Sequence, residues 1–339
     1  MQTTLKFSFF KLSLLLLVIS LVISCKTNEP VIFTSTSAEP VTDVDGNVYQ
    51  TITIGTQTWM TSNLKTTHYR DGSLIANVTD SAAWSKFVTG AYCDYANDAV
   101  NGNNYGHLYN GYAVSNISPI APAGWHVPSD TEWTTLSDFL GGIDGAGGRL
   151  KETKTDAFNW TAPNTAATNE IGFSALPGGY RHIRSNFYNK NDYGYWWSTS
   201  AIATTNILMS RGLIFNAGNL LKYFGFDKGN GFSVRCLKDM LPAVTSTAVS
   251  AITSTTAISG GMETYNGGAP ITAKGICWST SPAPTTAETT KTVETVTTAK
   301  FASTMLNLTP KTKYYVRAYI TNYLGTTYGE EFSFTTLAQ

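Results

Sequence analysis

Charged residues are scarce in this chain of 339 residues: they make up 14% of it, and its 23 basic residues equal its 23 acidic residues in number. No basic run or patch of the kind that neutralises phosphates occurs, so a nucleic-acid partner is not expected. Histidine is also rare, and none of the four has a second histidine at metal-ligand spacing. We therefore interpret His68, His107, His126 and His182 as polar loop or strand residues.

The usual catalytic signatures are missing as well. No Gly-x-Ser-x-Gly elbow and no phosphate-binding Gly-rich loop with lysine occurs, so we expect no nucleophile of that kind and no cofactor. The loop Asp43–Asn47 resembles the opening of a calcium loop, but no glutamate closes it, and a turn is the simpler interpretation. Glycoside cleavage needs two carboxylates across a cleft. The sequence gives no reason to pair any of the candidates, which are Glu132, Asp138, Glu152, Asp156, Glu170 and Asp192.

A long apolar run occurs only near the amino terminus. Lys6 and Lys11 precede the apolar residues 12–23, a pattern typical of a secretory signal and short for a membrane span. Residues 21–25, Leu-Val-Ile-Ser-Cys, resemble the lipobox of bacterial lipoproteins. The resemblance implies a signal peptide at residues 1–24, lipid attachment at Cys25 and a membrane partner reached through that lipid. An uncleaved membrane anchor is the alternative.

With Cys25 assigned to lipid, three cysteines are left, so at most one intrachain disulfide is possible. Cys93 and Cys236 are the candidate pair because both fall in the first domain. The alternative is that Cys93, Cys236 and Cys277 are all buried free thiols.

Composition divides the rest of the chain. Residues 25–40 are polar and lack periodicity, which predicts a flexible tether. Residues 41–239 form the expected first domain. Pro242 and a loss of aromatic density mark a boundary, and residues 244–339 show short alternating strands separated by Gly, Pro and Asn, as in a β-sandwich.

One segment of the second domain is more specific. The run Leu308–Tyr314 resembles the signature of fibronectin type III domains, in which Tyr314 would form the tyrosine corner by bonding to upstream backbone. Tyr314, Val316, Ala318 and Ile320 alternate with the residues between them, which predicts one buried face. The resemblance implies an all-β, immunoglobulin-like sandwich.

The clearest helix of the first domain is predicted at residues 129–140. Ser129 and Glu132 make a capping box, Trp133 and Leu136 share an apolar face with Phe139 and Leu140, and Gly141-Gly142 ends the helix. Shorter helices are expected at residues 80–87 and 148–152.

Seven motifs then follow one another along the first domain. They are Asp-Gly-Asn-Val-Tyr (45–49), Ile-Gly-Thr-Gln-Thr-Trp-Met-Thr-Ser-Asn-Leu (54–64), Tyr-Gly-His-Leu-Tyr-Asn (105–110), Gly-Trp-His-Val-Pro-Ser (124–129), Gly-Phe-Ser-Ala-Leu-Pro-Gly-Gly-Tyr-Arg (172–181), Tyr-Trp-Trp-Ser-Thr-Ser (195–200) and Phe-Ser-Val-Arg-Cys (232–236). This order resembles the Fibrobacter succinogenes major paralogous domain, found in secreted and lipid-anchored proteins of that bacterium and of the Bacteroidetes.

The same order is also similar to the C-type-lectin-like and formylglycine-generating-enzyme group, which implies an α+β C-type-lectin-like first domain. That enzyme's chemistry needs paired cysteines late in the domain, and only Cys236 is present. We therefore do not expect this catalytic activity.

Aromatic side chains are concentrated at residues 180–197, interleaved with Arg, His, Asn and Asp. Such a mixture suits a groove for a glycan or peptide, since rings stack on sugars and polar groups bond at the rim. Arg181, Tyr188 and Tyr193 are the candidate ligand contacts, with a core wall plus polar loop as the alternative. Trp197 is expected in the core. Asp80-Ser81-Ala82 resembles a Bacteroidetes O-glycosylation acceptor, with Ser81 as the modified residue.

Two hypotheses follow. The first is a non-enzymatic, lipid-anchored envelope protein that binds a glycan or protein. The second is a polysaccharide-acting hydrolase or modifying enzyme with an accessory sandwich. Lys26 follows Cys25 with no aspartate there, which favours the outer membrane, with the periplasmic and surface faces both open.

Overall fold

The computed structural model describes residues 33–202 and 206–339, and residues 33–339 form one compact unit. The signal peptide predicted at residues 1–24, the lipid site at Cys25 and the tether as far as residue 32 lie outside the described residues. No helix in the described part of the chain is long and apolar enough to cross a membrane.

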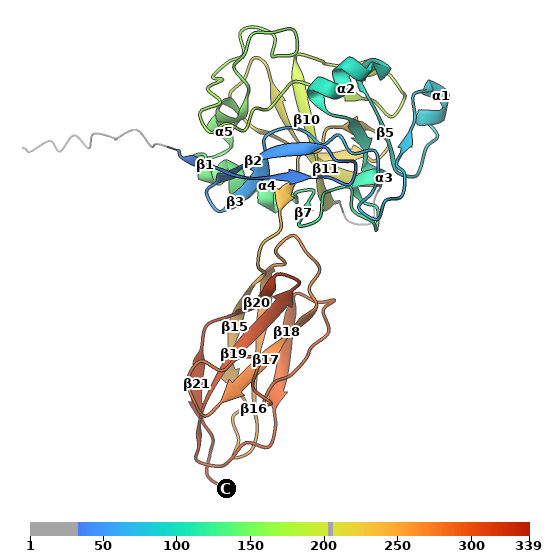
Figure 1. The fold of residues 1–339 in the computed structure, drawn as a ribbon. Coiled ribbons are helices and arrows are strands. Elements are labelled where there is room, and N and C mark those ends of the chain that lie inside the picture. The colour runs from blue at the N-terminus through green and yellow to red at the C-terminus, as the bar shows by residue number, and fades with distance from the viewer. Residues whose placement is uncertain (1–32, 203–205) are drawn as a thin grey trace, which may run out of the picture. The chain divides into compact units, whose positions relative to one another are not determined.

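The first domain (β1 to β14) begins with a five-stranded sheet that joins its two ends, in the order β1-β2-β3-β14-β7 (Figure 1). Its strands are β1 (Ser35–Thr42), β2 (Val48–Ile54), β3 (Gln57–Met60), β7 (Trp125–His126) and β14 (Leu237–Lys238). The tether predicted to reach residue 40 therefore ends earlier, because β1 pairs with β2 through its backbone although its side chains are polar. At the turn, the Asp43 carboxylate accepts the N–H groups of Asp45 and Asn47, as in a side-chain-bonded turn.

Two more sheets complete the strands of this domain. One has the order β4-β5-β6-β13-β8-β9, and the other is the meander β10-β11-β12. Successive residues of β10 point to opposite faces, so Trp196 and Trp197 enter two different hydrophobic clusters. Trp197 is fully buried, as expected. The bounds are β4 (Ala76–Asn77), β5 (Ala91–Cys93), β6 (Leu108–Asn110), β8 (Tyr180–Arg181), β9 (Phe187–Tyr188), β10 (Tyr193–Ala201), β11 (Ile207–Ile214), β12 (Leu221–Asp227) and β13 (Gly231–Phe232).

Helices are short, and the longest is the one predicted from its capping box. The helix α4 (Asp130–Phe139) starts after Ser129, whose side chain accepts the Glu132 N–H while Glu132 accepts the Ser129 N–H. Trp133 and Leu136 are buried, whereas Phe139 stays partly exposed. The expected helix at 148–152 is the end of α5 (Ile143–Leu150), which begins earlier. The others are α1 (Ser81–Trp84), the 3-10 turn η1 (Tyr95–Asn97), α2 (Ala99–Tyr105) and α3 (Gly111–Val114).

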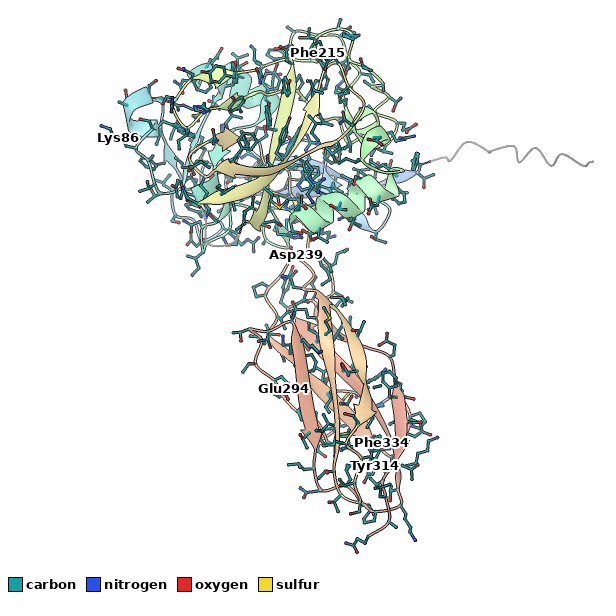
Figure 2. The ribbon with its side chains drawn as sticks, turned by 180° about the vertical axis from the view of Figure 1, so that it is seen from behind. Lys86, Phe215, Asp239, Glu294, Tyr314 and Phe334 are labelled. Carbon is teal, nitrogen blue, oxygen red and sulfur yellow. The ribbon has the colours of Figure 1, made fainter. Side chains whose placement is uncertain are left out.

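The second domain (β15 to β21) is the predicted fibronectin type III-like sandwich. One sheet has the order β15-β16-β18; the other has the order β17-β19-β20, with β21 also on β19. Tyr314 accepts the backbone N–H of Thr309 on its hydroxyl at 3.0 Å, which confirms the tyrosine corner, and its ring stacks on Phe334 (Figure 2). The strands are β15 (Ala243–Ser250), β16 (Ala257–Tyr265), β17 (Ala273–Ser279), β18 (Lys300–Met305), β19 (Lys313–Asn322), β20 (Gly325–Tyr328) and β21 (Phe332–Thr335).

A buried histidine holds two carboxylates near the end of the first domain. His126 on β7 lies 2.7 Å from Asp239 through Nδ1 and 2.8 Å from Glu132 through Nε2. Burial opposes a charge on the ring, but the hydrogen bonds to Asp239 and Glu132 outweigh it and raise the pKa of His126 to about 9. The hydroxyls of Tyr265 and Tyr323 donate to Glu132 and Asp239, respectively. The imidazolium is therefore held as an ion between the two acidic side chains.

The disulfide predicted between Cys93 and Cys236 is not formed. Among the described residues, Cys93, Cys236 and Cys277 are all free, buried thiols. Cys93 packs with Trp84 and Leu108, whereas Cys236 belongs to a different cluster of the core. Burial raises the pKa of Cys93 to about 12 and that of Cys236 further still, so both thiols stay protonated. They act as small apolar side chains.

Candidate functional site

Arg181, the central residue of the predicted aromatic groove, is buried. Its guanidinium donates to the carbonyls of Val78 (2.6 Å) and Thr79 (3.1 Å), and it lies over the Trp84 ring at 4.4 Å. The side chain has no exposed surface. The prediction that Arg181 contacts a ligand is therefore wrong, because both terminal nitrogens of its guanidinium donate to the backbone of a segment about a hundred residues away in the sequence.

The other two predicted ligand contacts, Tyr188 and Tyr193, both pack against neighbouring tyrosine rings. Tyr188 is 41% exposed and packs on Tyr180, while Tyr193 is half-buried and stacks on Tyr195 at 5.5 Å. Both rings are thus largely used in packing within the domain, although Tyr188 offers an exposed face. Ser81 is exposed at the start of α1, and its glycosylation stays a prediction.

A hollow lies instead beside the loop that follows α5; we call it the loop hollow. It has two adjoining arms of about 250 and 470 Å³, both lined by Lys154 and Asp156. The smaller arm is also lined by Thr61, Ser62, Asn63, Asn104, Glu152, Phe158, Asn159, Ser174 and Leu176. The larger arm is also lined by Thr153, Thr155, Trp160, Ala162, Pro163, Asn164 and Ala167.

Hydrogen bonds from three distant segments hold Asn63, one of the residues that line the smaller arm, in place. Asn63 follows β3 and is buried; its Oδ1 accepts from Trp196 Nε1 (2.9 Å) and from the buried Arg235 (2.8 Å). Its Nδ2 donates to the Tyr105 carbonyl at the end of α2. Three segments far apart in sequence are thus fastened at one amide, which fixes the floor of the arm.

The wall of the arm is built by a turn in the loop itself. Asp156 accepts the backbone N–H of Phe158 at 2.9 Å and the Asn159 side-chain amide at 2.6 Å on the same oxygen, Oδ1. Asn191 reaches from the neighbouring loop and donates to the Asn159 carbonyl at 2.7 Å. These bonds hold Asn159 in place although it lies outside regular secondary structure.

Two of the residues that line the loop hollow carry a buried polar atom without a partner in the described chain. Within residues 33–202 and 206–339, Oδ1 of Asn159, Oδ1 of Asn164 and the hydroxyl of Tyr105 have no hydrogen-bond partner. Asn159 is only 4% exposed and lines the smaller arm, whereas Asn164 lines the larger one. A buried acceptor without a partner costs about 1–3 kcal/mol, and an outside partner can reach these oxygens only if the side chains turn toward the hollow.

Charge in the hollow is predominantly negative. Glu152 is buried and accepts the backbone N–H groups of Thr153 and Lys154. Lys154 is exposed, and its Nζ lies 3.8 Å from the Glu152 carboxylate. The negative charge of Asp156 therefore has no second, balancing cation among the residues that line the hollow. The described part of the chain has no group of three or more His, Cys, Asp or Glu side chains able to hold a metal ion. The smaller arm is therefore negative overall and contains both donors and acceptors.

Sequence reasoning missed this site. Glu152 and Asp156 were named only as unpaired carboxylates, and Asn159 was not singled out. The one available signal was local: Asp156 and Asn159 stand three apart in a polar run before Trp160, a spacing typical of a side-chain-bonded turn. The contributions of Asn63 and Asn104 depend on tertiary contacts.

The family comparison decides what the first domain is. The model of the Fibrobacter succinogenes major domain matches residues 52–238, more than half of the chain. The chain belongs to this family. The match runs from β2 to β14, so the loop hollow lies within the major domain.

Two solved structures resemble the chain over less than a third of its length. The sensor domain of the anti-sigma factor RsgI4 of Pseudobacteroides cellulosolvens is 19% identical, over 29% of this chain and 96% of that one, with a TM-score of 0.23. The FN3 domain of human collagen XX is 25% identical, over 29% of this chain and 94% of that one, with a TM-score of 0.23. No curated protein matches the chain.

Proposed function

We propose that this protein is a lipid-anchored protein of the cell envelope whose major domain binds a glycan or protein ligand without transforming it. The observation that carries the proposal is the loop hollow, a polar cavity lined by asparagine, serine, threonine and carboxylate side chains together with Phe158. The fibronectin-like domain would serve as spacer or second contact. Family membership and an extracellular type of sandwich support this assignment.

We also propose a C-type-lectin-like architecture for the major domain. Supporting features are α4, introduced by β7 and Pro128, and the closing strand β14, which returns beside β3 and β7. In that group, ligands are bound by loops held on a small sheet-and-helix scaffold. Here the loop of residues 151–176 follows α5 directly, as a ligand-binding loop follows its scaffold in that group.

One observation favours a second candidate, a polysaccharide-acting hydrolase. Glu152 and Asp156 line the same arm of the hollow, and two carboxylates facing one sugar are what glycoside hydrolysis uses. Cys236 is buried and protonated, so a mechanism with a thiolate nucleophile is not supported for this second candidate.

The test is binding of the purified protein to a glycan array and to envelope fractions, followed by an assay for new reducing ends. Saturable binding with no new reducing ends is the expected result. Turnover that Glu152→Gln and Asp156→Asn each abolish would replace the binding function by the hydrolase.

Localisation has its own experiment. We expect radiolabelled palmitate to mark the wild-type protein, and Cys25→Ser to remove both the label and fractionation with the outer membrane. Protease shaving of intact and lysed cells then assigns the periplasmic or the surface face. A Cys25→Ser protein that keeps its label would contradict the lipid anchor.

A further inference from the structure

We propose that the loop hollow binds a segment of an uncharged saccharide chain, with neighbouring rings in its two arms. The inference rests on the proposed binding function and names the ligand class of that site.

The first argument is the chemistry of the lining. Asn159 Oδ1 is a buried acceptor without a partner in the described chain, and a second such acceptor, Asn164 Oδ1, belongs to the larger arm. Both oxygens are buried from solvent in this structure, so a ligand with donors can satisfy them once the two amide side chains turn toward the hollow. Ser62, Ser174 and Thr61 add hydroxyls, which can donate or accept. Each hydroxyl group of a sugar ring can likewise donate and accept hydrogen bonds.

The second argument is shape. The linings of the two arms share Lys154 and Asp156, so the arms lie next to each other. Each arm carries an aromatic side chain: Phe158 is half-buried in the smaller one, and Trp160 lies in the wall of the larger one. Aromatic faces pack against the C–H faces of sugar rings, and two of them along a bent path suit successive rings.

The third argument is charge. The smaller arm is lined by two carboxylates, Asp156 and Glu152, and by one cation, Lys154, so it is negative overall. Its carboxylates would repel the acid groups of uronic or sulfated sugars. Acidic polysaccharides are therefore excluded. A basic peptide is the other donor-rich candidate, but its affinity would come from ion pairs and would fall with salt.

The experiment uses the full chain and calorimetric titration with oligosaccharides of equal length: cello-, xylo- and manno-hexaose, hexagalacturonate, and hexalysine as the peptide probe. At least one neutral hexaose is expected to bind, with affinity unchanged between 50 and 500 mM salt, and hexagalacturonate is not. Asn159→Ala should weaken the neutral ligand about tenfold or more, since it removes a polar amide from the lining of the smaller arm. Tyr188→Ala, an exposed aromatic outside the hollow, is the matched control and should bind as the wild type does.

Asp156→Asn gives a second, charge-specific readout. It retains an oxygen that can accept from Phe158 and Asn159, but removes the charge, so it should admit hexagalacturonate. Loss of binding in Tyr188→Ala but not in Asn159→Ala would overturn the inference and leave the proposed function standing at the aromatic stretch. Preference for hexagalacturonate, or salt-sensitive binding of hexalysine alone, would also overturn it. Failure of every glycan and envelope fraction to bind would remove both proposals.

Discussion

Raising the pH should weaken the first domain through His126, whose pKa lies near 9 in the folded protein. An unperturbed imidazole titrates near 6.5, so the folded state holds this proton more tightly than the unfolded state does. The resulting stabilisation is fully present below pH 6.5 and is lost as the pH rises toward 9. The difference of about 2.5 pKa units corresponds to about 3 kcal/mol of unfolding free energy. The side chain is only 15% exposed, so solvent screens little of it.

Glu132 belongs to the same ion pair. Burial opposes its charge, but the contacts with His126, Tyr265 and Ser129 outweigh it and lower the pKa of Glu132 to about 2. Its stabilisation is present above pH 4.5 and disappears as the pH falls toward 2. Because the two shifts describe one interaction, their energies are not added.

Urea unfolding at pH 6, 7.5 and 9 measures the effect. We expect the wild type to lose about 3 kcal/mol between pH 6 and 9 and His126→Gln to lose far less. His126→Gln should also be destabilised at pH 6, since Glu132 and Asp239 stay buried without their cation. The control is His182→Gln, a half-buried histidine that accepts the Arg184 N–H and should keep the wild-type slope. Equal slopes in the wild type and His126→Gln would refute the reasoning.

Three further outcomes are expected. Tyr314→Phe should lower the unfolding free energy of the sandwich by about 1–2 kcal/mol, because the hydrogen bond to the Thr309 backbone is lost. Tyr315→Phe, on the other face of the strand, should lower it by less. Equal losses for the two variants in urea unfolding would contradict the tyrosine corner. Arg181→Met should lower the unfolding free energy by about 3 kcal/mol, since buried carbonyls lose their donors, and thermal denaturation that leaves the melting temperature unchanged would oppose this. Cys93 and Cys236 should react with a thiol reagent only after urea is added, and rapid labelling of the native protein would show that they are not buried thiols.

Features specified by neighbouring residues could be predicted from the sequence. The Ser129–Glu132 capping box and the Tyr314 corner each depend on contacts over three to five residues, and both are found in the structure. The alternation in β19 similarly places Val316 and Ile320 inside the sandwich.

Features that depend on distant partners could not. Arg181 has the residue type of a ligand contact, and only the fold brings the Val78 and Thr79 carbonyls to it. Cysteine counting allowed a bridge, whereas packing separates Cys93 from Cys236. The loop hollow likewise combines residues near 61, 104, 156 and 174, which no local pattern connects.

The pairing of Leu237 on β14 with Trp59 on β3 and His126 on β7 has a consequence for how the protein is made. A growing polypeptide cannot complete this sheet until almost the whole major domain has left the ribosome, because β14, which lies between β3 and β7, is synthesised last. Until then the unpaired backbone N–H and C=O groups along the edge of β3 can pair with strands of other chains. Chaperones would have to prevent this aggregation. Truncation before residue 237 should therefore yield an aggregating product and not a smaller folded one.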